Sequence, residues 1–332
     1  MASIRTGASA ILKYGYESSY AVDSPTCDKK FGLNDSVTSW SLTTNRIDLA
    51  SLNQVEYADY AYGQQQGSLS VGFTMSNPWI FRSVFGAPTV STNTFTYGTA
   101  SGGEYRAAKD LAGNTVAVQI GVDGSDVDVV RTCQGGVVNS LGLSTSIGNT
   151  VQGSIDMTYG KEVASSQTLV AAPTKPTNEF PYTFAHGELI IKGDGTAGNG
   201  VIQQLQDVDI TFAQNSNLLY QVGQNAAKDA YRQIFDVTGR FRAAHLGKDF
   251  HDHMIAQLAG GSYSETVGGT VEFKLSFVQT AGTKEIVIKG TGLSPTDYSI
   301  SGIVPVEPIF EDITWRIKSC QVVAEDASTT EE

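Results

Sequence analysis

Residues 67–85 read GSLSVGFTMSNPWIFRSVF, and residues 239–257 read GRFRAAHLGKDFHDHMIAQ. The two stretches align without a gap at an offset of 172 positions. Each begins with apolar residues at every second position, which is the period of a half-buried strand. Each continues with an Asn or Asp ahead of a short apolar run, a pattern typical of a capped helix. The sequence therefore predicts strand, turn and helix twice, with Asn77 and Asp249 as the caps.

Two further strands are expected in each copy. Residues 115–122 alternate like residues 270–277, and residues 155–159 alternate like residues 313–317. The first of these matches needs a shorter offset, so residues 89–114 are expected to be an insertion in the first copy. Their Ser, Thr, Gly and Asn content is typical of an exposed loop. Short β patterns can also match by chance, and the later strands alone do not exclude this.

The length of 332 residues suffices for two domains. Between the copies, residues 171–178 read AAPTKPTN, which is typical of a linker. We expect a first domain over residues 1–172, with an N-terminal arm and the insertion, and a second over residues 173–332, with an acidic C-terminal tail. The 35 glycines and 17% charged residues favour a mainly β protein. Residues 224–235 have roughly helical Ala and Ile spacing, and their conformation is left open.

The charge and cysteine content exclude some classes of function. A net charge of −12, with no basic cluster longer than Lys29-Lys30, argues against binding nucleic acid by counterion release. The same charge suits a surface that DNA passes without adhering, or one that is simply soluble. Cys27, Cys133 and Cys320 are too widely spaced to indicate a disulfide framework, which favours synthesis in the cytoplasm. No apolar run approaches the ~18 residues of a membrane helix, so no membrane partner is expected.

Residues 249–253, DFHDH, are the best candidate for a metal site. On a helix, His251 and His253 lie about 200° apart and do not share one ion, so a metal would need His245 or residues from elsewhere. The aligned residues of the first copy, 77–81, are NPWIF and hold no ligands of this kind. A capped, solvated helix start is the simpler interpretation.

Two other stretches resemble ligand-binding motifs, but a hairpin turn explains each of them. Residues 193–198, GDGTAG, match G-x-G-x-x-G, but β alternation follows them instead of a βαβ unit, so we interpret them as a hairpin tip. Residues 123–128, DGSDVD, resemble the start of a calcium loop but lack its closing Glu, and a hairpin turn explains them. No G-x-S-x-G or H-E-x-x-H occurs. We therefore expect no catalytic, cofactor-binding or metal-binding residues, no cofactor and no enzyme activity.

A family resemblance rests on the repeated stretch. Residues 66–81, QGSLSVGFTMSNPWIF, and residues 237–241, VTGRF, resemble the strand and following helix of tail tube proteins of tailed viruses. Residues 207–220 are similar to the strand before them. The resemblance covers most of residues 31–165 and 185–323 and is one of pattern, without an invariant signature. It implies a mainly β fold of two tandem tail-tube-like β-sandwich or barrel domains, each with a short α-helix.

The resemblance also implies a function. Tail tube proteins of bacteriophages or archaeal viruses are structural virion proteins that form stacked rings, and the viral genome is delivered through the hollow tube. Two domains in one chain imply three chains per ring with pseudo-sixfold symmetry. Expected partners are further copies of the chain, the tape measure, terminator and distal tail proteins, and DNA that passes without specific binding. Ring contacts are expected from the N-terminal arm up to Asp28, from residues 43–66 with Tyr57, Tyr60 and Tyr62, and from residues 89–114.

Two alternatives remain at this point. The chain is compatible with another ring-forming virion component, such as a tail terminator, a distal tail protein or a minor capsid protein. It is also compatible with a carbohydrate-binding β-sandwich in which Trp40, Trp79 or Trp315 forms a platform. Core packing is the simpler role for these tryptophans because they lie in strand or helix patterns.

Overall fold

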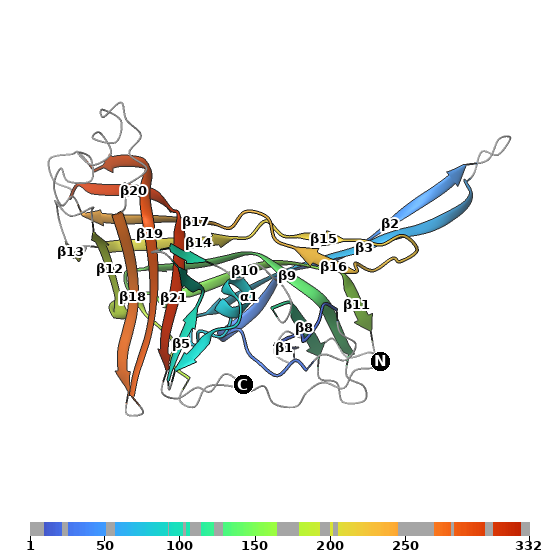
Figure 1. The fold of residues 1–332 in the computed structure, drawn as a ribbon, viewed down its shortest axis with the longest axis horizontal. Helices are drawn as coiled ribbons and strands as arrows, with labels where there is room; N and C mark the ends of the chain where they lie inside the picture. The colour runs from blue at the N-terminus through green and yellow to red at the C-terminus, as the bar shows by residue number, and fades with distance from the viewer. Residues whose placement is uncertain are drawn as a thin grey trace, which may run out of the picture.

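The fold of the computed structural model is mainly β, as the composition predicted, with large antiparallel sheets and a short helix. The long strands lie in two layers and a projecting hairpin (Figure 1). The structure describes residues 10–21, 26–50, 57–91, 93–101, 104–106, 114–122, 129–164, 179–192, 200–201, 205–244, 269–279, 282–302 and 308–326.

One layer is an eight-stranded antiparallel sheet that contains strands from both halves of the chain. The order of the strands follows from their successive pairings, and every pair of adjacent strands is antiparallel. From edge to edge the strands are β2 (Leu33–Ala50), β3 (Tyr57–Thr74), β10 (Gln152–Tyr159), β9 (Val129–Ser146), β14 (Leu205–Ala213), β17 (Asp236–Ala244), β20 (Phe310–Ile317) and β19 (Gly282–Ser301).

The second layer is two smaller sheets, one from each half. In the first half, β1 (Ala10–Tyr16) pairs with β8 (Val116–Val122), which pairs with the first part of β9, and β11 (Lys161–Ala164) pairs with β9 on its other side. In the second half, the order is β13 (Gly200–Val201), β12 (Gly187–Lys192), β18 (Gly269–Gln279), the first part of β19, β21 (Ser319–Asp326), β5 (Thr94–Tyr97) and β4 (Thr89–Ser91). Short hairpins are β6 (Thr99–Ser101) with β7 (Glu104–Arg106), and β15 (Asn217–Leu219) with β16 (Asp229–Tyr231).

A glycine marks the corner where each long strand leaves one layer and joins the other. Strand β9 pairs with β8 and β11 up to Gly136 and with β10 from Val137 onward. Strand β19 changes partners in the same way between Thr291 and Ser294. Gly135 and Gly292 have φ of 65° and 70°, a left-handed conformation that glycine adopts without the steric cost of a Cβ.

The strand pairings of the first half recur in the second. The pairs β1–β8, β2–β3, β3–β10, β10–β9, β8–β9 and β9–β11 correspond in chain order to β12–β18, β14–β17, β17–β20, β20–β19, β18–β19 and β19–β21. The tandem duplication and its boundary near residue 172 remain predictions, and this shared pairing scheme is the observation that agrees with them.

An aromatic ring covers a strand glycine at the same place in both halves. Gly67 lies opposite Tyr159, and Gly239 lies opposite Trp315. A Cβ on either glycine would come within 1.9 Å of the Tyr159 ring or 2.0 Å of the Trp315 ring. Tyr159 therefore corresponds to Trp315, whereas alternation alone had aligned Met157 with it, so the expected register was wrong by two residues.

The two halves share one core. Strand β14 pairs with β9, and β5 of the expected insertion pairs with β21 of the second half. The short helix α1 (Phe81–Phe85) lies at this junction, where the Phe85 ring contacts the rings of Phe212 and Phe235. Buried apolar side chains from both halves form one continuous cluster.

Several sequence expectations need correction. Residues 89–114 are not simply an exposed loop, because Phe95 and Tyr97 of β5 are buried in the shared core. The N-terminal arm is not free over β1, which pairs with β8. Asn77 does not cap α1 directly; its Oδ1 accepts a hydrogen bond from the backbone N of Trp79, in the turn before the helix.

Other expectations are confirmed or fall outside the described residues. The strands expected around residues 115–122, 155–159, 270–277 and 313–317 are present. Within residues 224–235 the structure has turns and the strand β16, with no helix. The predicted second helix at residues 249–257 and the 123–128 and 193–198 turns lie outside the described residues. The acidic tail was expected from Glu325 onward; Glu325 and Asp326 instead lie in strand β21, and residues 327–332 lie outside the described residues.

Candidate functional site

The candidate site is the outer face of the eight-stranded sheet, since the other face is buried against the second layer. Its residues alternate with the core residues of each strand, as the eBeBeBiB burial pattern of β10 shows. Opposite each other across the strands lie serines, threonines, aspartates and arginines. We call this surface the polar face; it includes Ser39, Ser41, Ser68, Ser70, Asp156, Ser140, Ser144, Asp207, Asp209, Arg240, Arg242, Asp312, Arg316 and Asp297.

On the first half, the polar face is a network of hydroxyl groups around one carboxylate. The Ser39 hydroxyl donates to Ser70 Oγ at 3.2 Å, and Ser70 donates in turn to Asp156 Oδ1 at 2.5 Å. From the other side, Ser140 donates to Asp156 Oδ2 at 3.0 Å. In the first half the polar face therefore consists of short side chains hydrogen-bonded to one another, with Asp156 as the carboxylate at the centre of the network.

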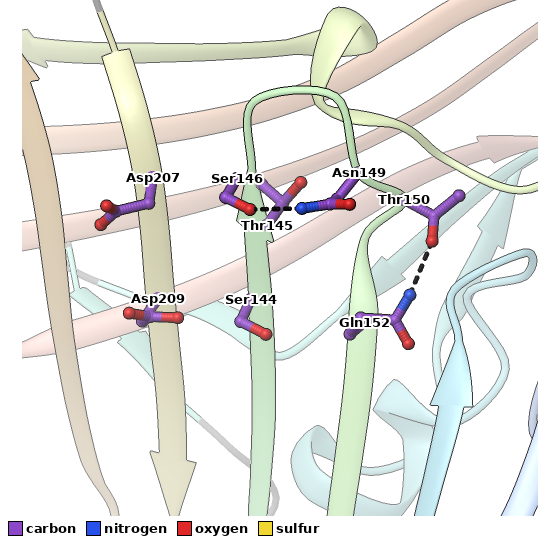
Figure 2. A pocket seen from close by; sticks show the side chains of 8 residues that line it. All are labelled: Ser144, Thr145, Ser146, Asn149, Thr150, Gln152, Asp207 and Asp209. Atoms are coloured by element: carbon purple, nitrogen blue, oxygen red, sulfur yellow. Dashed lines mark hydrogen bonds between the residues drawn. The ribbon is translucent and has the colours of Figure 1, made fainter.

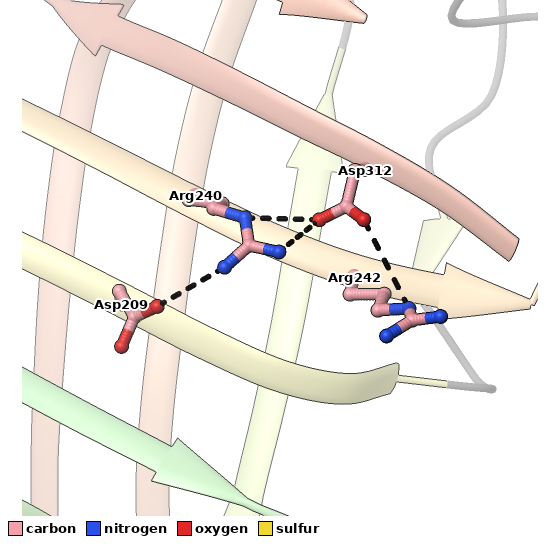
Figure 3. A network of polar contacts seen from close by, with 4 residues as sticks. All are labelled: Asp209, Arg240, Arg242 and Asp312. Atoms are coloured by element: carbon pink, nitrogen blue, oxygen red, sulfur yellow. Dashed lines mark hydrogen bonds and ion pairs between the residues drawn. The ribbon is translucent and has the colours of Figure 1, made fainter. Parts of the chain in front are cut away.

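On the second half, the polar face is a network of ion pairs (Figure 3). Arg240 donates from Nε and Nη2 to Asp312 Oδ1, at 2.9 and 2.5 Å, and its Nη1 lies 3.9 Å from Asp209 Oδ2. Arg242 Nε lies 3.9 Å from Asp312 Oδ2, and its guanidinium stacks 4.6 Å from the centre of the Phe310 ring. The hydrogen bond to Asp312 raises the pKa of Arg240 above its usual value.

A third arginine of the polar face is paired in the same way. Arg316 on β20 donates from Nε to Asp236 Oδ1 at 3.2 Å and from Nη2 to Asp236 Oδ2. The hydrogen bonds with Asp236 raise the pKa of the Arg316 guanidinium. Each arginine of the polar face therefore lies against an aspartate of a neighbouring strand.

An open hollow of about 450 Å³ lies where the two halves meet at one end of the polar face (Figure 2). Its lining is hydroxyl, amide and carboxylate groups: Ser144, Thr145, Ser146, Asn149, Thr150, Gln152, Asp207 and Asp209. Burial raises the pKa of Asp207 and of Asp209, and the nearby Arg240 opposes both shifts. The hollow is wide enough to hold water, and its lining is polar throughout.

The described residues contain no group of three or more His, Cys, Asp and Glu that could hold a metal ion. The metal candidates His245, His251 and His253 lie outside the described part of the chain. The thiols of Cys27, Cys133 and Cys320 are all buried and form no disulfide. Burial raises the pKa of Cys27 and of Cys133 to about 12, so these thiols are weak nucleophiles.

The three tryptophans do not form one exposed platform. Trp79 and Trp315 are buried in the core, as their patterns predicted. Trp40 on the edge strand β2 is 40% exposed, and its Nε1 donates to Tyr159 Oη at 2.9 Å. Sequence reasoning did not single out the polar face, because its signal is only the serines and charges that alternate with the core residues.

The projecting element predicted at residues 43–66 is confirmed as a structure. Here β2 and β3 continue beyond the sheet as a two-stranded hairpin (Figure 1). Arg46 stacks 4.6 Å from the Tyr60 ring centre, and Tyr60 packs edge-on against Tyr62. We call this part of the hairpin the arm; its exposed apolar side chains are those of Ile47, Leu49, Tyr60 and Tyr62.

Comparison with known proteins agrees with this fold. The phage tail tube protein family matches residues 7–317, and the chain therefore belongs to this family. The chain is thus a virion tail component. No curated protein matches the sequence.

One solved structure similar to the chain is part of the anti-feeding prophage (AFP) baseplate, determined by cryo-EM with sixfold symmetry. The identity is 5% and the TM-score 0.31, over 45% of this chain and 96% of that chain. Among the described residues, none of the helices has the length and apolar character needed to cross a membrane.

Proposed function

We propose that this protein forms stacked rings that make a hollow tail tube, with three chains per ring and the polar face lining the channel for DNA. The proposal rests on the family and on the two edge strands of the eight-stranded sheet, β2 and the second part of β19, each of which pairs within this sheet with one described strand only. An open edge leaves unpaired backbone groups, and closing the sheet into a barrel with other copies removes both edges.

The pairing of β9 with β14 inside the chain is the model for the proposed pairing of β19 with β2 between chains. Where β14 pairs with β9, the side chains of Val208, Ile210 and Leu141 are buried. The 172-residue offset matches Leu69 and Gly67 of β3 with Phe241 and Gly239 of β17. Trp40 and Leu42 lie opposite the first pair, and Val208 and Ile210 lie opposite the second, so Trp40 and Leu42 are the counterparts of Val208 and Ile210.

The counterparts at the open edges are exposed. Trp40 and Leu42 are 40% and 42% exposed, whereas Val208 and Ile210 are each 1% exposed. On the other edge, Ile300 of β19 is 40% exposed, and its counterpart Leu141 of β9 is 0% exposed. Burying such side chains contributes about 1.5–3 kcal/mol each when burial is complete, which favours pairing of β2 with β19 of the next chain. This is the observation that carries the proposal.

The dimensions suit a DNA channel. Three eight-stranded sheets would close into a barrel of twenty-four strands. With strands about 4.8 Å apart and tilted by about 40°, such a barrel is roughly 50 Å across between backbones. Inward-facing side chains of the polar face are short or paired, so the remaining channel would admit a DNA duplex. Its aspartates outnumber its arginines, which would repel phosphate.

We further propose that the arm joins successive rings. It extends beyond the sheet, and it carries exposed aromatic and aliphatic side chains whose burial in a neighbouring ring would stabilise stacking. The tape measure, terminator and distal tail proteins would meet the ends of the tube. The role is structural, with no chemistry assigned to any residue.

The substitution Leu42→Asp tests the edge pairing. We expect the variant to remain folded and monomeric, because a charge at this edge opposes burial and pairing. Mass in solution and electron micrographs would show loss of rings and tubes. The matched control is Val90→Asp, which alters an exposed side chain of β4 away from both edges. Normal tubes from the Leu42→Asp variant would contradict the proposed edge, and a single ring in place of tubes in the unmodified protein would favour a terminator or distal tail role.

A further inference from the structure

The arginines of the polar face raise a specific question about a surface that DNA passes. Arg240 and Arg242 lie on β17 (Figure 3), and Arg316 lies on the neighbouring strand β20. A guanidinium presents a planar fork of donors that binds phosphate through two parallel hydrogen bonds. Free arginines on a channel wall would therefore retain the DNA backbone, even on a chain with a net charge of −12.

Asp312 stands between two of these arginines and contacts both. Its Oδ1 accepts from Nε and Nη2 of Arg240, and its Oδ2 lies 3.9 Å from Nε of Arg242. The Asp312 side chain is 23% exposed, whereas those of Arg240 and Arg242 are 47% and 38% exposed. The less exposed carboxylate thus accepts hydrogen bonds from two of the Arg240 donors that a phosphate would use, and it forms a longer ion pair with Arg242.

The alternative is that these pairs serve only to hold the strands together. Opposite charges on adjacent strands do stabilise a sheet. The first half shows, however, that the polar face also folds with hydroxyl groups around a single carboxylate, Asp156. The second half carries arginines on this face, and each arginine forms an ion pair with an aspartate.

We propose that Asp312 prevents Arg240 and Arg242 from binding the sugar-phosphate backbone of DNA, and that Asp236 does the same for Arg316. This inference rests on the proposed function, in which the polar face lines the channel. It assigns Asp312 a positioning role: the residue acts on DNA passage through the two arginines and does not itself touch DNA.

The test measures binding of a fluorescent DNA duplex of about 20 base pairs to the full-length protein by anisotropy at several salt concentrations. Asp312→Asn removes one charge, keeps the side-chain size and takes away the carboxylate that both guanidinium groups contact, while Asp207 and Asp209 stay opposite them on β14. We expect about tenfold tighter binding than for the control, and a log–log salt slope steeper by about one for each phosphate that a released arginine binds.

The matched control is Asp156→Asn, which removes the same charge from the same face but releases serine hydroxyls and no arginine. It should bind the duplex only slightly better than the unmodified protein, because it loses one charge that repels phosphate. The triple variant Asp312→Asn, Arg240→Gln, Arg242→Gln should return to the level of this control. Asp236→Asn provides a second test if Asp312→Asn does not fold, because it releases the exposed Arg316.

Equal binding by Asp312→Asn and Asp156→Asn would overturn the inference, as would tight binding that persists in the triple variant. Equal binding by Asp236→Asn and Asp156→Asn would overturn it for Arg316. These measurements use the unassembled chain, on which the polar face is accessible. They are therefore independent of tube formation, which micrographs of the unmodified protein test separately.

Discussion

At the scale of single residues, Asp207 shows how the junction between the halves affects stability. Its Oδ1 is buried without a hydrogen-bond partner at the rim of the polar hollow. Desolvation raises the pKa of this carboxyl above its usual value, although Arg240 and Arg242 oppose the shift. Because the folded state favours the protonated form, ionised Asp207 reduces the free energy of unfolding above the folded pKa, and this cost disappears below the unfolded pKa.

The substitution Asp207→Asn should therefore stabilise the subunit in a pH-dependent way. We expect a melting temperature higher by roughly 1–3 °C at pH 7, a small effect because the group is partly exposed. The gain should shrink as the pH falls through the folded pKa and vanish below about pH 3.5. Thermal melts across this range measure it, with Asp297→Asn as the control for losing one charge. A gain that is the same at every pH would exclude ionisation of Asp207 as its cause.

The sequence alone predicted which side chains of several strands lie in the core. The period-two alternation located the core side chains of β3, β17 and β20 correctly. It did not predict that Tyr159 and Trp315 are counterparts, because alternation is unchanged by a shift of two residues. The ring that covers Gly67 or Gly239 fixes the register, and that packing requires the partner strand to be in place.

At the scale of elements, the arm and the edge strands β2 and β19 expose apolar side chains. The arm is held at its base by contacts to the second half: Tyr220 Oη donates to the carbonyl of Gln65 at 2.8 Å, and Gln65 N donates to the carbonyl of Asn225 at 2.7 Å. Beyond this base the hairpin has no third strand among the described residues. A two-stranded hairpin of this kind is marginal alone, so a partner surface would stabilise it.

Replacing residues 46–62 by an Asn-Gly turn should separate ring formation from stacking. The base of the arm and the sheet edges remain, so we expect folded subunits and single rings without long tubes. Electron micrographs and sedimentation would measure the lengths. The double variant Tyr60→Ser, Tyr62→Ser keeps the hairpin and should shorten tubes by a smaller amount. Tubes of normal length from the shortened protein would show that stacking uses another surface.

Sequence patterns predicted most elements but not how they combine. The strands near residues 115–122 and 313–317 follow from local alternation, and the arm follows from a polar stretch with tyrosines. The place of β5 was not predictable in this way. Its neighbours are rich in Ser, Thr and Gly, and its Phe95 and Tyr97 are buried only because β21, more than 200 residues away, pairs with it.

At the scale of the whole molecule, the chain contains one junction of the kind that would close the ring. Strands β9 and β14 join the halves, and in the proposed ring β19 and β2 would present the corresponding edges to other copies. A chain that carries one such junction covalently needs three copies to provide six equivalent units. The same arrangement would turn the polar face of every copy toward the axis of the proposed ring.

The most direct test is a cryo-EM reconstruction of the assembled tube at a resolution that traces strands. We predict three chains per ring, β2 of one chain paired with β19 of the next, and Asp156, Arg240 and Asp312 facing the channel. Six full-length chains per ring, or a polar face directed to the outside, would contradict the proposal.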